Sequence, residues 1–152
     1  NLQAAVGLAQ LERLTEFVQQ KREMGKYYTE KLKDINGLIL PLEKTEYADN
    51  IYWVYGIVLS KELPIDNRMI QELLVQEGIG TRTFFWCMHE QPVYKSKGFF
   101  QNESYPNAEY LARKGFYIPS GLALTKEQMD KVVSGVHKVM RNFCEGEGNE
   151  TG

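Results

Sequence analysis

Residues 2–32, LQAAVGLAQLERLTEFVQQKREMGKYYTEKL, form the longest periodic stretch of the chain. Its apolar side chains recur at helical spacing, at Leu2, Ala5, Val6, Ala9, Leu14, Phe17, Val18, Met24, Tyr27, Tyr28 and Leu32. Charged residues fall between them, proline is absent, and only Gly7 and Gly25 weaken the pattern. The stretch therefore predicts one helix of about eight turns, which is long for a single domain. Asn36-Gly37 predicts the stop, because glycine suits the left-handed residue after a helix.

The helical pattern begins with the first residues of the chain, without a preceding strand or loop. Position 1 is Asn rather than Met. This start favours a piece of a longer protein, although removal of a tag leaves the same kind of start. Apolar residues at both ends of so long a helix predict that it packs against more than one body. We therefore expect a neighbouring domain.

Beyond this helix, aromatic and β-branched runs alternate with further helical patterns. Extended segments are predicted at residues 38–40, 51–59, 79–85 and 116–119, with a bulge at Gly56. Helices are predicted at residues 67–77, 107–115 and 126–143, and residues 86–106 are predicted to be irregular. Asp66 is the expected cap of the first of these helices, and Thr125 with Gln128 forms a capping box at the start of the last.

These elements predict an α+β fold, with a small, mostly antiparallel sheet flanked by helices and one long helix leading in. Residues 1–143 are expected to form a single domain. Residues 144–152 are acidic and rich in glycine, which predicts a disordered tail.

The composition limits the classes of function. The chain has 152 residues, 43% of them hydrophobic and 25% charged, with a formal net charge of −2. This balance is typical of a soluble globular domain and favours neither nucleic acid nor a membrane as partner. Cys87 and Cys144 are too far apart in sequence to suggest a disulfide framework, so a reducing cytoplasm is expected. With His89 and His137 they also lack the spacing of zinc ligands, so no metal site is predicted.

One stretch combines the side chains that a binding site needs. Residues 81–94, TRTFFWCMHEQPVY, place a cation, three consecutive aromatic residues, a histidine and a tyrosine at the end of a predicted strand and in the loop after it. Arginine can pair with phosphate, and aromatic rings can stack on a base or a sugar. The alternative is packing: at least one of Phe84 and Phe85 should belong to the core, and Trp86 could do so too.

Several segments of the chain, in order, resemble the DegT/DnrJ/EryC1/StrS aminotransferases. The opening residues 1–14 are similar to the segment that begins the second half of these enzymes. Residues 78–82 (GIGTR) and 89–94 (HEQPVY) resemble their next signature, and residues 105–109 (YPNAE) and 118–128 (IPSGLALTKEQ) resemble two more. Arg82 followed by two phenylalanines, and the residues LAL at 122–124 after PSG at 119–121, resemble the perosamine-synthase branch of the family.

The resemblance implies the carboxyl-terminal small domain of a fold-type-I homodimer whose large amino-terminal domain holds pyridoxal 5'-phosphate on a lysine. Such enzymes transfer an amino group from glutamate to a nucleotide-linked keto sugar, here a GDP-linked 4-keto-6-deoxymannose. It implies substrate-binding roles for Arg82, Phe85, Trp86, His89 and Tyr94. It implies no catalytic, cofactor-binding or metal-binding residue in this chain, because the lysine motif of the family is missing from it.

Two functions therefore stay open. In the first, the chain is the small domain of a sugar-nucleotide aminotransferase and is inactive without the cofactor-binding domain. In the second, it is a stand-alone, non-catalytic binding or assembly module with the same fold.

Overall fold

The computed structural model describes residues 1–144, and its first segment contains two helices instead of the predicted one. Helix α1 (Leu2–Glu12) and helix α2 (Leu14–Leu32) are separated at Arg13, which has φ −103° and ψ 5°. The Arg13 guanidinium turns toward α2, where it pairs with Glu16 at 2.9 Å and lies over the ring of Phe17. The prediction of one continuous helix was wrong here because the apolar spacing runs on through the break.

Within residues 1–144, four short strands form one antiparallel sheet in the order β1-β2-β4-β3. They are β1 (Leu38–Ile39), β2 (Tyr55–Leu59), β3 (Arg82–Thr83) and β4 (Gly115–Ile118). This arrangement confirms the predicted α+β class and the predicted antiparallel sheet. The predicted bulge at Gly56 is wrong, because the ladder between β2 and β4 continues through Gly56 and its partner Tyr117.

Two predicted strands are shorter than expected. The segment 51–53 lies outside the sheet because Tyr52 has φ 50°, and its N–H donates to the side-chain oxygen of Asn50 at 2.7 Å. In the predicted run 79–85, only Arg82–Thr83 pairs as a strand.

The remaining large helices are α3 (Asn67–Gln76), α5 (Pro106–Lys114) and α6 (Lys126–Cys144). The predicted caps of α3 and α6 are confirmed. The side chain of Asp66 accepts from the N–H groups of Arg68 and Met69 at 3.0 and 2.9 Å. Thr125 and Gln128 exchange two side chain–backbone bonds of 2.9 and 3.2 Å, which is the capping box.

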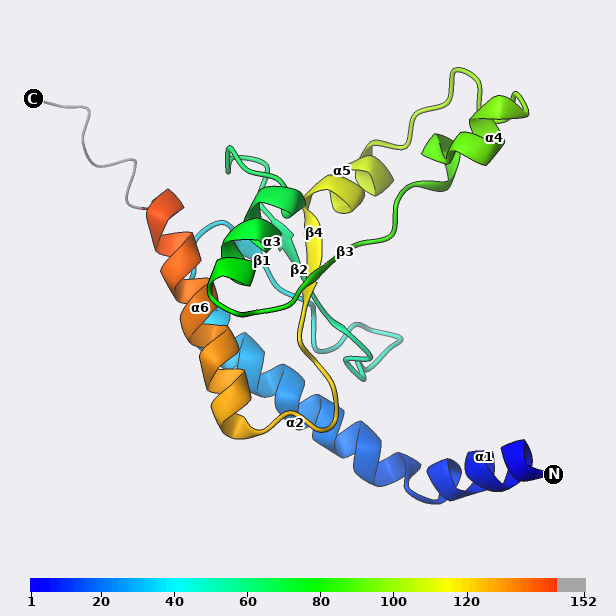
Figure 1. Cartoon of the computed structure of the whole chain (residues 1–152), viewed down its shortest axis with the longest axis vertical. Helices are drawn as coiled ribbons and strands as arrows, with labels where there is room; N and C mark the ends of the chain where they lie inside the picture. The colour runs from blue at the N-terminus through cyan, green and yellow to red at the C-terminus, as the bar shows by residue number, and fades with distance from the viewer. Residues whose placement is uncertain (145–152) are drawn as a thin grey trace, which may run out of the picture.

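The core lies between one face of the sheet and the helices α2, α3 and α6. In Figure 1, α2 and α6 run side by side, and α1 leads away from this body. The residues of the core include Met24, Tyr28, Leu32, Tyr55, Ile57, Leu59, Ile70, Leu74, Phe116, Ile118, Val132, Val136 and Met140. The buried side chain of Asn67 donates to the carbonyl oxygens of Ala112 and Gly115 at 2.7 and 2.9 Å, and so joins α3 to the end of α5.

Residues 86–105, hereafter the arm, leave the sheet after β3 and return at α5. The arm projects from the body and contains a short 3-10 helix (Met88–Glu90) and α4 (Pro92–Ser96) (Figure 1). The prediction of an entirely irregular segment was therefore wrong. Pro92 stands at the start of α4, where proline is favoured because the N–H it lacks would have no helical partner.

No helix among residues 1–144 is both long and apolar enough to cross a lipid bilayer. The predicted disordered tail lies outside the described residues, apart from Cys144, the last residue of α6.

Candidate functional site

A cavity of about 670 Å³ opens beside β3, the edge strand of the sheet, and Gln71 of α3 also lines it. It gathers Arg82, Phe85 and Trp86, which the sequence predicts as binding residues. Trp53, from the loop before β2, lies in the same wall, so both tryptophans of the chain line this cavity.

The inner wall of the cavity is the ring of Phe84. It stacks on Tyr117 of β4 with 4.6 Å between ring centroids, and it covers two glycines of the sheet. A Cβ atom at Gly56 would lie 2.8 Å from this ring, and one at Gly115 would lie 2.4 Å from it. Phe85, in contrast, is 79% exposed. The expectation that at least one of this pair packs inward is therefore confirmed, and Phe84 is that residue.

The cavity offers a cation beside flat apolar surfaces. Arg82 is exposed, and its guanidinium has no ion-pair or hydrogen-bond partner among residues 1–144. The hydroxyl of Thr81 is buried in the same wall and lacks a hydrogen-bond partner in the described part of the chain. A free guanidinium suits a phosphate or carboxylate, and the rings of Phe85 and Trp86 suit the face of a base or sugar.

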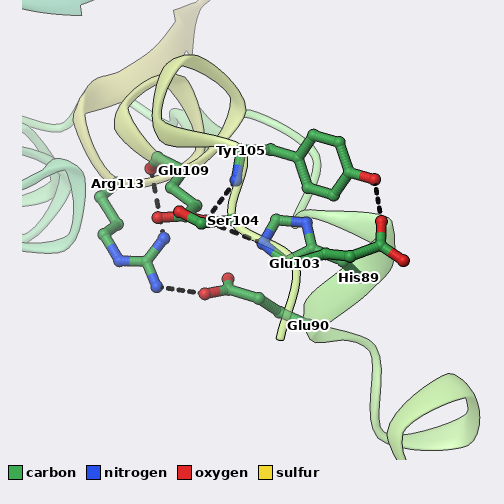
Figure 2. Close-up of polar contacts among 7 residues, drawn as sticks. All are labelled: His89, Glu90, Glu103, Ser104, Tyr105, Glu109 and Arg113. Atoms are coloured by element: carbon green, nitrogen blue, oxygen red, sulfur yellow. Dashed lines mark hydrogen bonds and ion pairs between the residues drawn. The ribbon is translucent and has the colours of Figure 1, made fainter. Parts of the chain in front are cut away.

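His89 lies at the base of the arm (Figure 2), and it is not among the residues that line this cavity. Its Nε2 lies 3.0 Å from Oε1 of Glu109 on α5, and its ring packs on Tyr105 at 4.9 Å. The same Oε1 accepts from the N–H of Tyr105 at 2.9 Å and the hydroxyl of Ser104 at 3.3 Å. The backbone bond from Tyr105, followed by the bonds from His89 and Ser104, lowers the pKa of Glu109.

An ion pair between Arg113 and Glu90 lies beside the contact between His89 and Glu109 (Figure 2). The guanidinium of Arg113 binds Glu90 at 2.6 Å and lies over the ring of Trp86, 5.0 Å from its centroid. The other oxygen of Glu90 is buried and has no hydrogen-bond partner among the described residues. Cys87 is buried close by, and burial raises the pKa of its thiol.

Tyr94 belongs to the outer part of the arm. Its ring makes edge contacts with Phe99 and Phe100, at centroid distances of 6.2 and 5.8 Å. The structure therefore brings Arg82, Phe85 and Trp86 together in one cavity and places His89 and Tyr94 on the arm.

Sequence reasoning missed Trp53, Glu109 and Arg113. Trp53 lies in the predicted strand 51–59, and nothing local indicates that it meets residues 82–86. Its carbonyl oxygen accepts from Lys21 of α2 at 3.0 Å, a contact that only the folded chain creates. Glu109 and Arg113 are spaced like an ion pair within one helix, although both reach the arm instead.

No group of three or more His, Cys, Asp or Glu side chains among residues 1–144 is placed to hold a metal ion.

Known proteins with similar sequences include GDP-perosamine synthases and other proteins of polysaccharide biosynthesis. The chain is 29% identical to the GDP-perosamine synthase of Escherichia coli O157:H7 over 138 residues, which are 91% of this chain and 35% of that protein. It is 30% identical to the lipopolysaccharide biosynthesis protein RfbH of Salmonella typhimurium over 135 residues, covering 88% of this chain and 31% of RfbH. The chain thus spans about a third of the length of these relatives.

The fold is also shared with a solved aminotransferase. Helicobacter pylori PseC, an aminotransferase involved in the biosynthesis of pseudoaminic acid, superposes with a TM-score of 0.82 at 20% identity, over 93% of this chain and 37% of PseC. The model of the DegT/DnrJ/EryC1/StrS aminotransferase family matches residues 1–137. On this match, which covers nearly the whole of the described structure, the chain belongs to the DegT/DnrJ/EryC1/StrS aminotransferase family.

Proposed function

We propose that this chain is the carboxyl-terminal, cleft-closing domain of an aminotransferase that moves an amino group from glutamate to a nucleotide-linked 4-keto-6-deoxy sugar, of the kind that yields GDP-perosamine. Membership of the aminotransferase family and the similarity to a GDP-perosamine synthase support this proposal. The observation that carries it is the cavity in which the unpaired Arg82 lies beside Phe85 and Trp86.

In this proposal the cavity binds the sugar nucleotide. Arg82 pairs with diphosphate oxygens, because its planar guanidinium can donate two parallel hydrogen bonds to one phosphate. The exposed rings of Phe85 and Trp86 stack on the base or on the sugar.

His89 and Tyr94 reach the ligand from the arm. Nε2 of His89 is occupied by Glu109, which leaves Nδ1 for a substrate hydroxyl. The hydroxyl of Tyr94 has no hydrogen-bond partner within residues 1–144 and can serve in the same way.

The cofactor of this reaction is pyridoxal 5'-phosphate, which when bound withdraws electrons from the carbon that carries the amino group. The residues that line this cavity do not fit it. The lining of the cavity contains neither a lysine for a Schiff base nor a carboxylate for the ring nitrogen. The partly buried Lys21 is no substitute, since its Nζ donates to the carbonyl oxygens of Trp53 and Ser120. We therefore assign the cofactor and the catalytic residues to the rest of the parent protein.

Helix α1 is the surface that we expect to meet that part. It has no buried residue, and its apolar side chains Leu2, Val6, Leu8 and Leu11 are 82%, 57%, 58% and 63% exposed. Leu2 and Val6 lie on one side of the helix, and Leu8 and Leu11 lie on another, so α1 is apolar on more than one face. A helix of this kind is typical of one that packs against a neighbour. The parent is proposed to be a cytoplasmic homodimer.

The chain alone is expected to lack aminotransferase activity, because the proposed substrate cavity has neither a lysine nor a carboxylate for the cofactor. The measurement is an assay of the chain with pyridoxal 5'-phosphate, glutamate and the GDP-linked keto sugar, beside the full-length protein as positive control. Amino-sugar formation by the chain alone would contradict the assignment of catalysis to the missing part. If the full-length protein is inactive too, the stand-alone binding module is favoured instead.

Replacing Arg82 with alanine in the full-length protein is expected to raise KM for the sugar nucleotide about 10- to 100-fold, because charge-assisted hydrogen bonds to phosphate contribute about 1.5–3 kcal/mol. The kcat should change little, since the diphosphate does not react. Steady-state kinetics test this, with Arg141→Ala as the control, an exposed arginine of α6. An unchanged KM in Arg82→Ala would remove Arg82 from the binding site.

A further inference from the structure

The two ends of the arm meet at a single carboxylate oxygen. His89, on the outgoing end, and Ser104 and Tyr105, on the returning end, all bond to Oε1 of Glu109 (Figure 2). The ring contact between His89 and Tyr105 joins the same two ends directly. Glu109 therefore closes the base of the arm against α5.

One helical turn later, Arg113 contacts two residues at the start of the arm, Trp86 and Glu90. Its guanidinium binds Glu90 at 2.6 Å and stacks on Trp86, with 5.0 Å between its central carbon and the ring centroid. Trp86 is the point where the arm leaves the cavity wall. Arg113 therefore lies between the fixed helix α5 and one of the rings that line the cavity.

These contacts differ from ordinary surface ion pairs, which contribute about 0–1 kcal/mol. The side chains of His89 and Glu90 are only 10% and 16% exposed. Their partners Glu109 and Arg113 project from the same face of α5, because residues four apart lie one above the other on a helix. Two adjacent arm residues are thus held by two adjacent turns of α5, which fixes the direction in which the arm leaves the body.

We infer that Glu109 and Arg113 are positioning residues that lock the base of the arm onto α5 and hold the ring of Trp86 at the edge of the cavity, where it meets the substrate. The effect on substrate rests on the proposed function. The placement of the Trp86 ring by Arg113 does not depend on the proposed function. The placement of the ring and its effect on substrate binding can therefore be tested separately.

The test uses the full-length protein labelled with fluorotryptophan. The fluorine NMR resonance of Trp86 is identified as the one that disappears in Trp86→Phe. Arg113→Lys keeps the positive charge for Glu90 but loses the planar group that stacks on the ring. We expect this resonance to shift in both Arg113→Lys and Arg113→Ala, and KM for the sugar nucleotide to rise about three- to tenfold at unchanged kcat.

The variant Glu109→Gln tests the contacts at the base of the arm independently of the ring of Trp86. It should speed amide hydrogen exchange in peptides from residues 86–105, with little change elsewhere, because the carboxylate that binds both ends becomes a neutral amide. Arg68→Lys, at an exposed arginine of α3 whose guanidinium has no partner within residues 1–144, is the matched control and should alter none of these readouts.

An unshifted Trp86 resonance in both Arg113 variants overturns the inference, and so does unchanged exchange of the arm in Glu109→Gln. The proposed function fails by a different result. If Trp86→Ala leaves KM unchanged, Trp86 does not bind substrate, whereas the resonance in the Arg113 variants still decides whether Arg113 holds the ring.

Discussion

Replacing Asn67 with leucine is expected to lower the free energy of unfolding by about 1–3 kcal/mol, because a buried polar group that loses its partner costs about that much. The amide of Asn67 is 3% exposed and donates to the carbonyl oxygens of Ala112 and Gly115. Leucine has a similar size but no donor. The carbonyl of Ala112 would then lose this bond inside the protein, while that of Gly115 keeps its bond from the N–H of Phe84.

Urea denaturation followed by circular dichroism measures this loss. Asn107→Leu is the control, since Asn107 is exposed on α5, and surface changes of this kind usually stay within about 0.5 kcal/mol. Equal midpoints for the two variants would show that the buried amide does not stabilise the joint between α3 and α5.

Replacing Gly115 with alanine is expected to destabilise the fold by about 1–3 kcal/mol, the usual range for overpacking. The backbone of Gly115, with φ −88°, suits any residue, so space is the limiting factor. An added Cβ would lie 2.4 Å from the ring of Phe84 and 2.5 Å from the carbonyl oxygen of Leu111. The ring cannot retreat toward the sheet, because Gly56 and Tyr117 hold its other side.

Because Phe84 forms the inner wall of the cavity, Gly115→Ala should also weaken sugar-nucleotide binding. Thermal unfolding and KM are the two measurements. Gly80→Ala is the matched control, since a Cβ there meets nothing within 4 Å. A variant as stable as the wild type, with normal binding, would mean that Phe84 can move aside and is not fixed by the glycines.

The features that could be predicted from the sequence depend on chemistry within a few residues. Asp66 and Thr125 cap helices with their own side chains, and the aromatic and β-branched residues of the run 51–59 indicate the strand that forms at 55–59. Arg82, Phe85 and Trp86 share a cavity because they follow one another at the end of a strand. In each case the partner is close in sequence.

The features that could not be predicted depend on partners far along the chain. Tyr52 and Trp53 look like strand residues, but Asn50 turns the backbone and Lys21 of α2 binds the carbonyl of Trp53. His89 pairs with a carboxylate twenty positions later, so its partner depends on where the arm returns. Pro92 was the one local signal for α4 that the sequence did offer.

The closed base of the arm has a consequence for how this domain can diversify. Since both ends are tied to α5, the stretch between them behaves as an appendage whose length is nearly independent of the core. Each doubling of a flexible loop adds only about 0.6 kcal/mol of closure entropy. Insertions, deletions or a grafted peptide near Gly98 would then change the contacts made by the outer part of the arm. The base of the arm and the adjacent cavity wall would keep their positions.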